Sequence, residues 1–243
     1  MTATYAIADA GASVEARATE LFTQQWHKRL ATVDRMFAAL LAGQWVFGIL
    51  LAFFFSPYGW EGKVKVIHTH VYIAIFMGGA IALFPILLAI YRPGSRLTRH
   101  VIAISQMLAS ALLIHLSGGR IETHFHVFGS LAFLAFYLDW RVLISATLVV
   151  ASEHFLRGIF WPESVYGITN PEWWRFLEHA FWVAFEDVIL VWSCINGQRE
   201  MRFTARQQAE LEAVTEKETL KSAALEMALM EFESRGEMGG ATA

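Results

Sequence analysis

Long apolar stretches recur along this chain, and they constrain its fold more than any other feature. A membrane-spanning helix needs about 20 largely apolar residues. Hydrophobic residues make up 56% of the chain and charged residues 17%, against about 45–50% and 25% in soluble domains. We therefore expect an all-α, polytopic membrane helix bundle with about six transmembrane helices. The expected spans are about 33–55, 66–91, 101–117, 126–139, 141–161 and 177–195.

The fourth of these stretches is short, and it would cross a membrane only if it extended through Ile121–Phe125 or paired closely with the fifth. The spans divide the chain into four expected parts. Residues 1–30 form an N-terminal segment, 31–197 the six-helix transmembrane domain, 198–236 a helical linker and 237–243 a disordered tail.

The linker after Gly197 is polar and contains no Pro. Some of its apolar residues follow a heptad seam, although Glu218 and Lys221 interrupt that seam. We expect an amphipathic, coiled-coil-like helix that continues the last span and pairs with a second copy of the chain. A solvated helix without a partner remains the alternative. The seam residues are Leu211, Val214, Leu225, Ala228 and Phe232.

Basic residues predict the orientation, because Lys and Arg concentrate beside the cytoplasmic ends of spans. Ten of them flank the ends on one side and four flank the ends on the other. Six crossings place both termini on the ten-residue side, so both termini are expected in the cytoplasm, with the chain in the inner membrane of a bacterium. The two sets are Lys28, Arg29, Arg35, Arg92, Arg96, Arg99, Arg141, Arg199, Arg202 and Arg206 against Lys63, Lys65, Arg120 and Arg175.

Several functional classes are excluded. The net charge of −3 does not indicate a nucleic-acid partner, and Cys194 is the only cysteine, so neither an intrachain disulfide nor a cysteine-rich metal cage can form. The chain has no Gly-rich phosphate loop, no nucleophile elbow and no zinc-protease helix.

Histidine placement predicts the chemistry. Of nine histidines, seven fall on the outer halves of five expected spans, and four glutamates accompany them. Ionisable groups at membrane depth are costly and are usually paired or functional. Imidazoles with carboxylate partners are preferred by Fe, Cu and Zn. We therefore expect a transition-metal site. Its candidate ligands are His68, His70, His115, His124, His126, His154 and His179, and the candidate supporting acids are Glu122, Glu153, Glu178 and Glu186.

Other interpretations of these residues stay open. Haem b is a less favoured cofactor, because paired histidines from different helices can ligate it. A metal-free cluster that senses protons needs only a histidine titrating near neutral pH. Any single histidine could also simply satisfy an interhelical contact. His68 and His70 lie about 200° apart on a helix, so both face inward only if the helix start is unwound.

With these residues identified, the chain resembles the multi-span N-terminal input module of bacterial sensory proteins, which are membrane sensor histidine kinases and chemoreceptor-type signal transducers. The resemblance covers about residues 30–205 and implies a membrane sensor whose last helix runs into a cytoplasmic signalling helix and output partner. It implies no particular ligand. The matching stretches are His68–His70, His115–His126, Tyr137–Arg141, His154–Gly158 and Trp173–His179.

Such receptors usually continue into a kinase, cyclase or methyl-accepting domain, whereas this sequence stops at Ala243. It is therefore expected to be either a truncated input module or a protein that signals through a separate partner. A non-enzymatic signal-input role is favoured. A membrane metalloenzyme of the diiron or copper oxidase type is the alternative, and an ion or proton carrier ranks lowest, because the inner halves of the spans carry few ionisable groups.

Overall fold

The computed structural model describes the backbone of residues 2–240 and the side chains of residues 11–232. Within this part the chain is almost entirely helical, as expected. It divides into two compact units. Residues 26–198 form the larger unit, and residues 1–25 together with 199–243 form the smaller one. The two longest helices, α1 (Thr2–Phe55) and α8 (Arg175–Gly240), contribute to both units.

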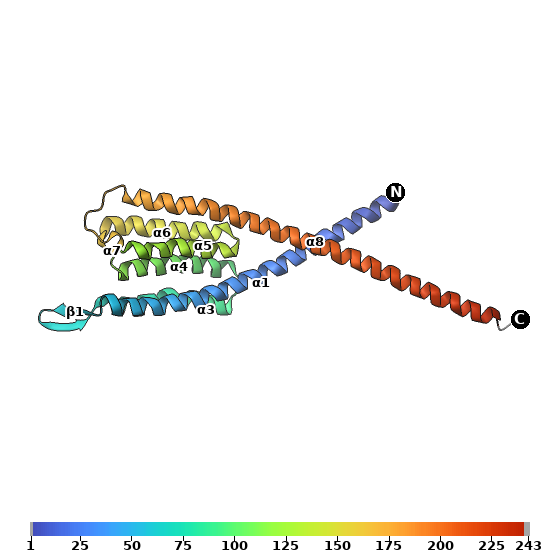
Figure 1. Cartoon of the computed structure of the whole chain (residues 1–243), viewed down its shortest axis with the longest axis horizontal. Coiled ribbons are helices and arrows are strands. Elements are labelled where there is room, and N and C mark those ends of the chain that lie inside the picture. Colours follow the sequence, from blue (N-terminus) through green and yellow to red (C-terminus); the bar gives the residue numbers. More distant parts are fainter. Residues whose placement is uncertain (1, 241–243) are drawn as a thin grey trace. The chain divides into compact units, whose positions relative to one another are not determined.

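The larger unit is a helix bundle in which α4 (Arg96–Leu116) is the most buried helix (Figure 1). Its neighbours include α3 (Gly78–Tyr91), α5 (Ile121–Leu134) and α6 (Trp140–Phe160). In the most apolar segment of α4, 72% of the residues are buried, against 11% in that of α8. α4 therefore supplies the centre of the apolar core, with Ile102, Met107 and Ile114 fully buried.

The remaining elements are short. They are α2 (Thr69–Tyr72), the π-helix η1 (Ile73–Met77), the 3-10 helix η2 (Ala135–Tyr137) and α7 (Glu163–Tyr166). α2, η1 and α3 follow one another without interruption and replace the single span expected over 66–91. The π-helical turn lets the indole N–H of Trp45 donate to the carbonyl oxygens of Ala74 and Ile75, at 3.2 and 3.1 Å.

A β-hairpin precedes α2, and the sequence analysis did not anticipate it (Figure 1). Strand β1 (Tyr58–Glu61) pairs antiparallel with β2 (Val64–Ile67). Gly62 takes a positive φ of 63° in the turn, a conformation that favours glycine. β-branched residues at Val64, Val66 and Ile67 around a Gly-containing turn were the available signal. The second helical span consequently begins at Thr69 rather than at residue 66.

The outward faces of the bundle are strongly apolar. Side chains such as Phe54, Phe76 and Val188 are 82%, 71% and 67% exposed. Many exposed large apolar side chains are unfavourable in water and favour a membrane-facing or protein-facing surface. Five helices of the described part are long and apolar enough to cross a membrane, namely Gly11–Phe55, Thr69–Tyr91, Arg96–Leu116, Trp140–Phe160 and Arg175–Phe232.

The expected fourth span differs from the other five. It extends back to Ile121, as its length required, but α5 ends at Leu134 and the 3-10 turn η2 follows it. Its 14 residues fall short of the length of the other five helices. Among the described residues, five helices are therefore long and apolar enough to cross a membrane, and α5 is not one of them.

A buried polar cluster connects the middle of α1 with the chain just before α4 and just before α6. The carboxylate of Asp34 accepts hydrogen bonds from the Tyr137 hydroxyl, at 2.7 Å, and from the Gly94 N–H. Arg99 and Asp139 form a buried ion pair at 3.0 Å. These contacts tie α1 to the loops before α4 and before α6, and they satisfy charges that burial would otherwise penalise.

The smaller unit pairs the beginning of α1 with the part of α8 after residue 198. Ala18, Leu21, Ala205 and Ala209 are buried against one another. Arg17 and Glu212 form an ion pair at 2.8 Å. The N-terminal segment is therefore part of a helix that packs on the linker. The seam residues Leu211, Val214, Leu225, Ala228 and Phe232 are exposed. α8 extends to Gly240, and residues 241–243 of the expected disordered tail lie outside the described part.

Candidate functional site

The structure separates the seven outer histidines into three groups instead of one continuous cluster. His124, His154 and His179 form the first group, which we call the histidine triad. His68, His70 and His115 form the second, and His126 lies apart in a hydrogen-bonded network. The expected single layer of seven imidazoles is therefore corrected to three separate environments.

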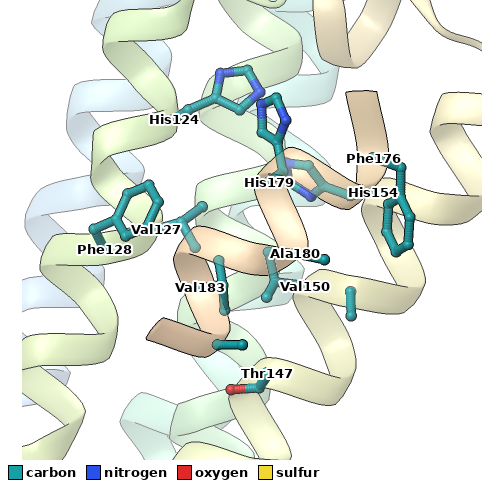
Figure 2. Close-up of a pocket in the computed structure, with 12 residues that line it drawn as sticks. His124, Val127, Phe128, Thr147, Val150, His154, Phe176, His179, Ala180 and Val183 are labelled. Atoms are coloured by element: carbon teal, nitrogen blue, oxygen red, sulfur yellow. The ribbon is translucent and has the colours of Figure 1, made fainter. Parts of the chain in front are cut away.

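The histidine triad joins three helices of the larger unit, with one ring each from α5, α6 and α8. The ring centroids of His124 and His154 are 5.6 Å apart, those of His124 and His179 are 5.3 Å apart, and those of His154 and His179 are 6.1 Å apart. His124 and His154 are each 5% exposed. Figure 2 shows the three rings together at one end of a pocket.

In each triad ring, Nδ1 lies beside an oxygen. Nδ1 of His124 is 3.0 Å from the carbonyl oxygen of Arg120, and Nδ1 of His179 is 3.0 Å from that of Arg175. Nδ1 of His154 is 2.7 Å from Oε2 of Glu153, a close contact in which neither atom has a hydrogen-bond partner. Carbonyl oxygens only accept hydrogen bonds, so in a neutral His124 or His179 ring the proton resides on Nδ1 and the Nε2 lone pair is free. Nε2 of His124 is buried and has no hydrogen-bond partner.

Glu153 is held in place by a second residue. Arg157, four residues further along α6, forms an ion pair with it. The same guanidinium donates to the carbonyl oxygen of Ala111 on α4, at 3.1 Å, and to the carbonyl oxygen of Ser164 on α7, at 2.5 Å. Arg157 therefore fixes Glu153 against two other elements. The sequence analysis quoted Arg157 only within a motif and gave it no role. Its position one helical turn after Glu153 was the available signal.

The pocket beside the triad is enclosed by apolar side chains of α5, α6 and α8. It measures about 140 Å³ and includes Val127, Val150 and Val183 among its walls, with Thr147 at the end away from the rings (Figure 2). The Thr147 hydroxyl donates to Oδ2 of Asp187 at 2.5 Å. Tyr166 of α7 places its ring 5.6 Å from that of His179, and burial raises the pKa of its phenol, so the phenol stays neutral.

The second group lies where the hairpin meets the bundle. The ring centroids of His68 and His70 are 4.4 Å apart, those of His70 and His115 are 4.9 Å apart, and the Trp161 ring is 4.9 Å from His115. His68 caps α2, and its Nδ1 accepts a hydrogen bond from the His70 N–H. The helix start is therefore unwound at His68, the condition under which both rings can share one side. His68 thus has a structural role as a helix cap.

The four acids differ in their surroundings. Glu153 is the one that contacts a histidine side chain among the described residues. Glu122 is exposed and pairs with Arg120. The Glu178 side chain is exposed, although Glu178-His179 repeats the Glu153-His154 dipeptide. Oε2 of Glu186 is buried and has no hydrogen-bond partner.

Metal-ligand geometry is the last test of the site. Within the described part of the chain, no group of three or more His, Cys, Asp or Glu side chains stands in a position to hold a metal ion. The triad comes near to such a group. A tetrahedral ion bound by three imidazole nitrogens at about 2.0–2.1 Å places the ring centroids about 5 Å apart, and the triad's separations are 5.3–6.1 Å.

The fold and the site define an α-helical protein with several helices suited to a membrane and a histidine-lined apolar pocket between three of them. No protein-family model and no solved structure match the chain. The chain is similar to the transducer protein Htr8 of Halobacterium salinarum, with 32% identity over 133 aligned positions. The match covers 49% of this chain and 21% of that relative, so the chain matches about a fifth of the relative's length.

Proposed function

We propose that this chain is a membrane-embedded sensory input module whose histidine triad binds a transition metal ion. The observation that carries the proposal is the meeting of three rings from three helices, each with Nδ1 beside an oxygen, and with Nε2 of His124 buried and without a partner. Histidines that bind metals through one ring nitrogen characteristically donate the other N–H to a carboxylate or backbone carbonyl. Metal binding would require the three side chains to rotate until their Nε2 atoms face a common point. Fe, Cu and Zn all suit imidazole ligands.

The proposed module crosses the cytoplasmic membrane of a bacterium six times, with both termini in the cytoplasm. The ten-to-four distribution of basic residues supports this orientation. α5 and η2 together, Ile121–Tyr137, span about 25–27 Å at helical rises of about 1.5 and 2.0 Å per residue. That length approaches the thickness of the hydrocarbon core, about 30 Å. α5 would therefore form the shortest of the six crossings.

Signal relay would run through α8. This helix carries His179 and continues without a break beyond the bundle to residue 240. An external metal, redox or gaseous cue that changed the triad would act on α8 directly. Such a cue can shift the bundle between a resting and a signalling arrangement only if it binds the two with different affinities. The exposed seam from Leu211 to Phe232 supports pairing with a second copy of the chain and contact with a cytoplasmic output domain or partner.

The test is metal analysis of protein purified without chelators, together with two matched triple variants. In one variant the triad, His124, His154 and His179, is replaced by Ala, and in the other the second group, His68, His70 and His115, is replaced by Ala. We expect the wild type and the second variant to retain stoichiometric metal and the triad variant to lose it. Equal metal content in all three proteins would contradict the proposal.

The same purified protein discriminates the remaining alternatives. A Soret absorption band would assign haem b instead of a bare ion. Steady oxygen consumption with an added reductant would favour a metalloenzyme of the oxidase type, for which the apolar pocket beside the triad would be the substrate site. Metal binding without turnover is the result that a sensory input module requires.

A further inference from the structure

The turn between η2 and α6 has a backbone conformation that is unusual for its residue. Leu138 has a positive φ of 53°, and it is the one residue other than glycine with a positive φ in the described part of the chain. L-residues rarely adopt this left-handed conformation, because their Cβ atom then approaches the following carbonyl oxygen. Such a residue persists only where its surroundings hold it, and such residues concentrate at functional and switch regions.

Helix α8 holds this turn in two ways. The side-chain amide of Gln198 donates a hydrogen bond to the carbonyl oxygen of Leu138 at 2.7 Å, and the buried Cys194 thiol donates to that of Ala135 at 3.6 Å. Gly197 also leaves room for the Leu138 side chain, since a Cβ atom added at Gly197 would lie 2.7 Å from Cδ2 of Leu138. The left-handed Leu138 is therefore supported directly by α8.

Helix α1 holds the same short stretch of chain. Nε of Arg29 donates to the carbonyl oxygen of Phe136 at 2.9 Å, and the hydroxyl of the next residue, Tyr137, donates to Asp34 at 2.7 Å. Carbonyl oxygens at the end of a helix lack intrahelical donors. Donors from α1 and α8 thus complete the hydrogen bonding of two carbonyl groups, at Phe136 and Leu138, that are only two residues apart.

These contacts lie where both long helices leave the larger unit. That unit begins on α1 at Trp26 and ends on α8 at Gln198, so Arg29 lies within its first helical turn and Gln198 is its last residue. A displacement of α8 that breaks the Gln198 hydrogen bond removes the support of Leu138. The relaxed turn then also displaces the neighbouring carbonyl group that binds Arg29.

We propose that the turn from Ala135 to Leu138 is a conformational coupling element, through which a movement of α8 at the end of the bundle reaches α1. The coupling is reciprocal, as thermodynamic linkage requires. A cue that acts on α8 at His179 would therefore change both helices at the points where they leave the bundle. Its use in signal relay rests on the proposed function, whereas the coupling itself needs no metal at the triad.

The test is amide hydrogen exchange, read by mass spectrometry, on the metal-free full chain in phosphatidylcholine nanodiscs, because exchange reports local opening of a helix. Gln198→Leu removes the donor on α8, and Gln207→Leu makes the same change at an exposed position of that helix. Arg29→Leu removes the donor on α1, and Lys28→Leu removes an exposed cation beside it. Each variant is read on the other helix, where the sequence is unchanged, in peptides that cover residues 24–36 of α1 or 190–202 of α8. A peptide from α4 reports on the bundle as a whole.

We expect Gln198→Leu to speed exchange in the α1 peptide, and Arg29→Leu to speed it in the α8 peptide, by about three- to tenfold, the range for one hydrogen bond. The α4 peptide and both control variants should exchange as in the wild type. Faster exchange confined to the helix that carries the substitution, or an equal increase in α4, would overturn the proposal.

The wild type is then measured with added Zn²⁺, which separates this proposal from the proposed function. Changed exchange in the α1 and α8 peptides together is the expected result, and a change confined to α8 would overturn the coupling. A wild type that binds no Zn²⁺ would contradict the proposed function, and the metal-free comparison of variants would still decide the coupling.

Discussion

The repeated Glu-His dipeptide provides the sharpest test of the proposed metal site. Glu153 is half-buried and lies 2.7 Å from Nδ1 of His154, whereas Glu178 is exposed beside His179. Glu153→Gln therefore removes the carboxylate beside a proposed ligand ring, and Glu178→Gln makes the same chemical change where no such contact exists. Loss of a supporting partner typically lowers metal affinity about 10- to 100-fold, or about 1.4–2.7 kcal/mol.

The assay is chelator competition for Zn²⁺ on the two purified single variants and the wild type. We expect Glu153→Gln to weaken binding by about 10- to 100-fold and Glu178→Gln to leave it within about twofold of the wild type. Glu153 also pairs with Arg157, so the thermal midpoint is recorded for each protein. An equal loss of affinity in both variants, or a larger loss in Glu178→Gln, would refute the role given to Glu153.

Three further predictions concern the packing that positions the site. A Cβ atom at Gly79 would lie 2.9 Å from the Trp45 ring, so Gly79→Ala should destabilise the bundle by about 1–3 kcal/mol. Gly48→Ala, whose Cβ would have its nearest contact at 3.6 Å, should be neutral or stabilising. Thermal unfolding in detergent compares the two variants. Tyr137→Phe removes a buried hydrogen-bond donor to Asp34 and should lower the free energy of unfolding by about 1–3 kcal/mol. Tyr91→Phe, at an exposed position, should change the free energy of unfolding little. An equal loss of stability in both variants would contradict the role given to the buried polar cluster. Ala209→Lys places a charge in the contact between α1 and the linker and should speed tryptic cleavage at Arg17. Ala223→Lys, at an exposed position of the same helix, should leave that cleavage rate unchanged. Equal cleavage rates in the two variants would contradict the packing of α1 on the linker.

The sequence predicted the all-helical character well, because apolar composition and span length depend on each stretch of chain alone. The backward extension of the fourth helix to Ile121 is confirmed, since α5 begins there. The hairpin at Tyr58–Ile67 was missed because each strand is only four residues long, and most of the hairpin lies in the expected loop between the spans 33–55 and 66–91. The packing of Ala18 and Leu21 on Ala205 and Ala209 was also missed, since a contact between distant small residues leaves no periodic signal.

The candidate site, like the fold, was predicted from the sequence only in part. Residue types and approximate depth selected all seven histidines, and these follow from the sequence because the helical rise is constant. The sequence could not determine how the rings associate, because a ring's direction depends on helix rotation and on neighbours far away in the chain. Tertiary structure therefore decided that His124, His154 and His179 meet across three helices, that His126 turns to Gln44 instead, and that Glu153 rather than Glu178 supports a ring. The local sequence supplied the chemical groups, and the packing of helices decided which of them share a site.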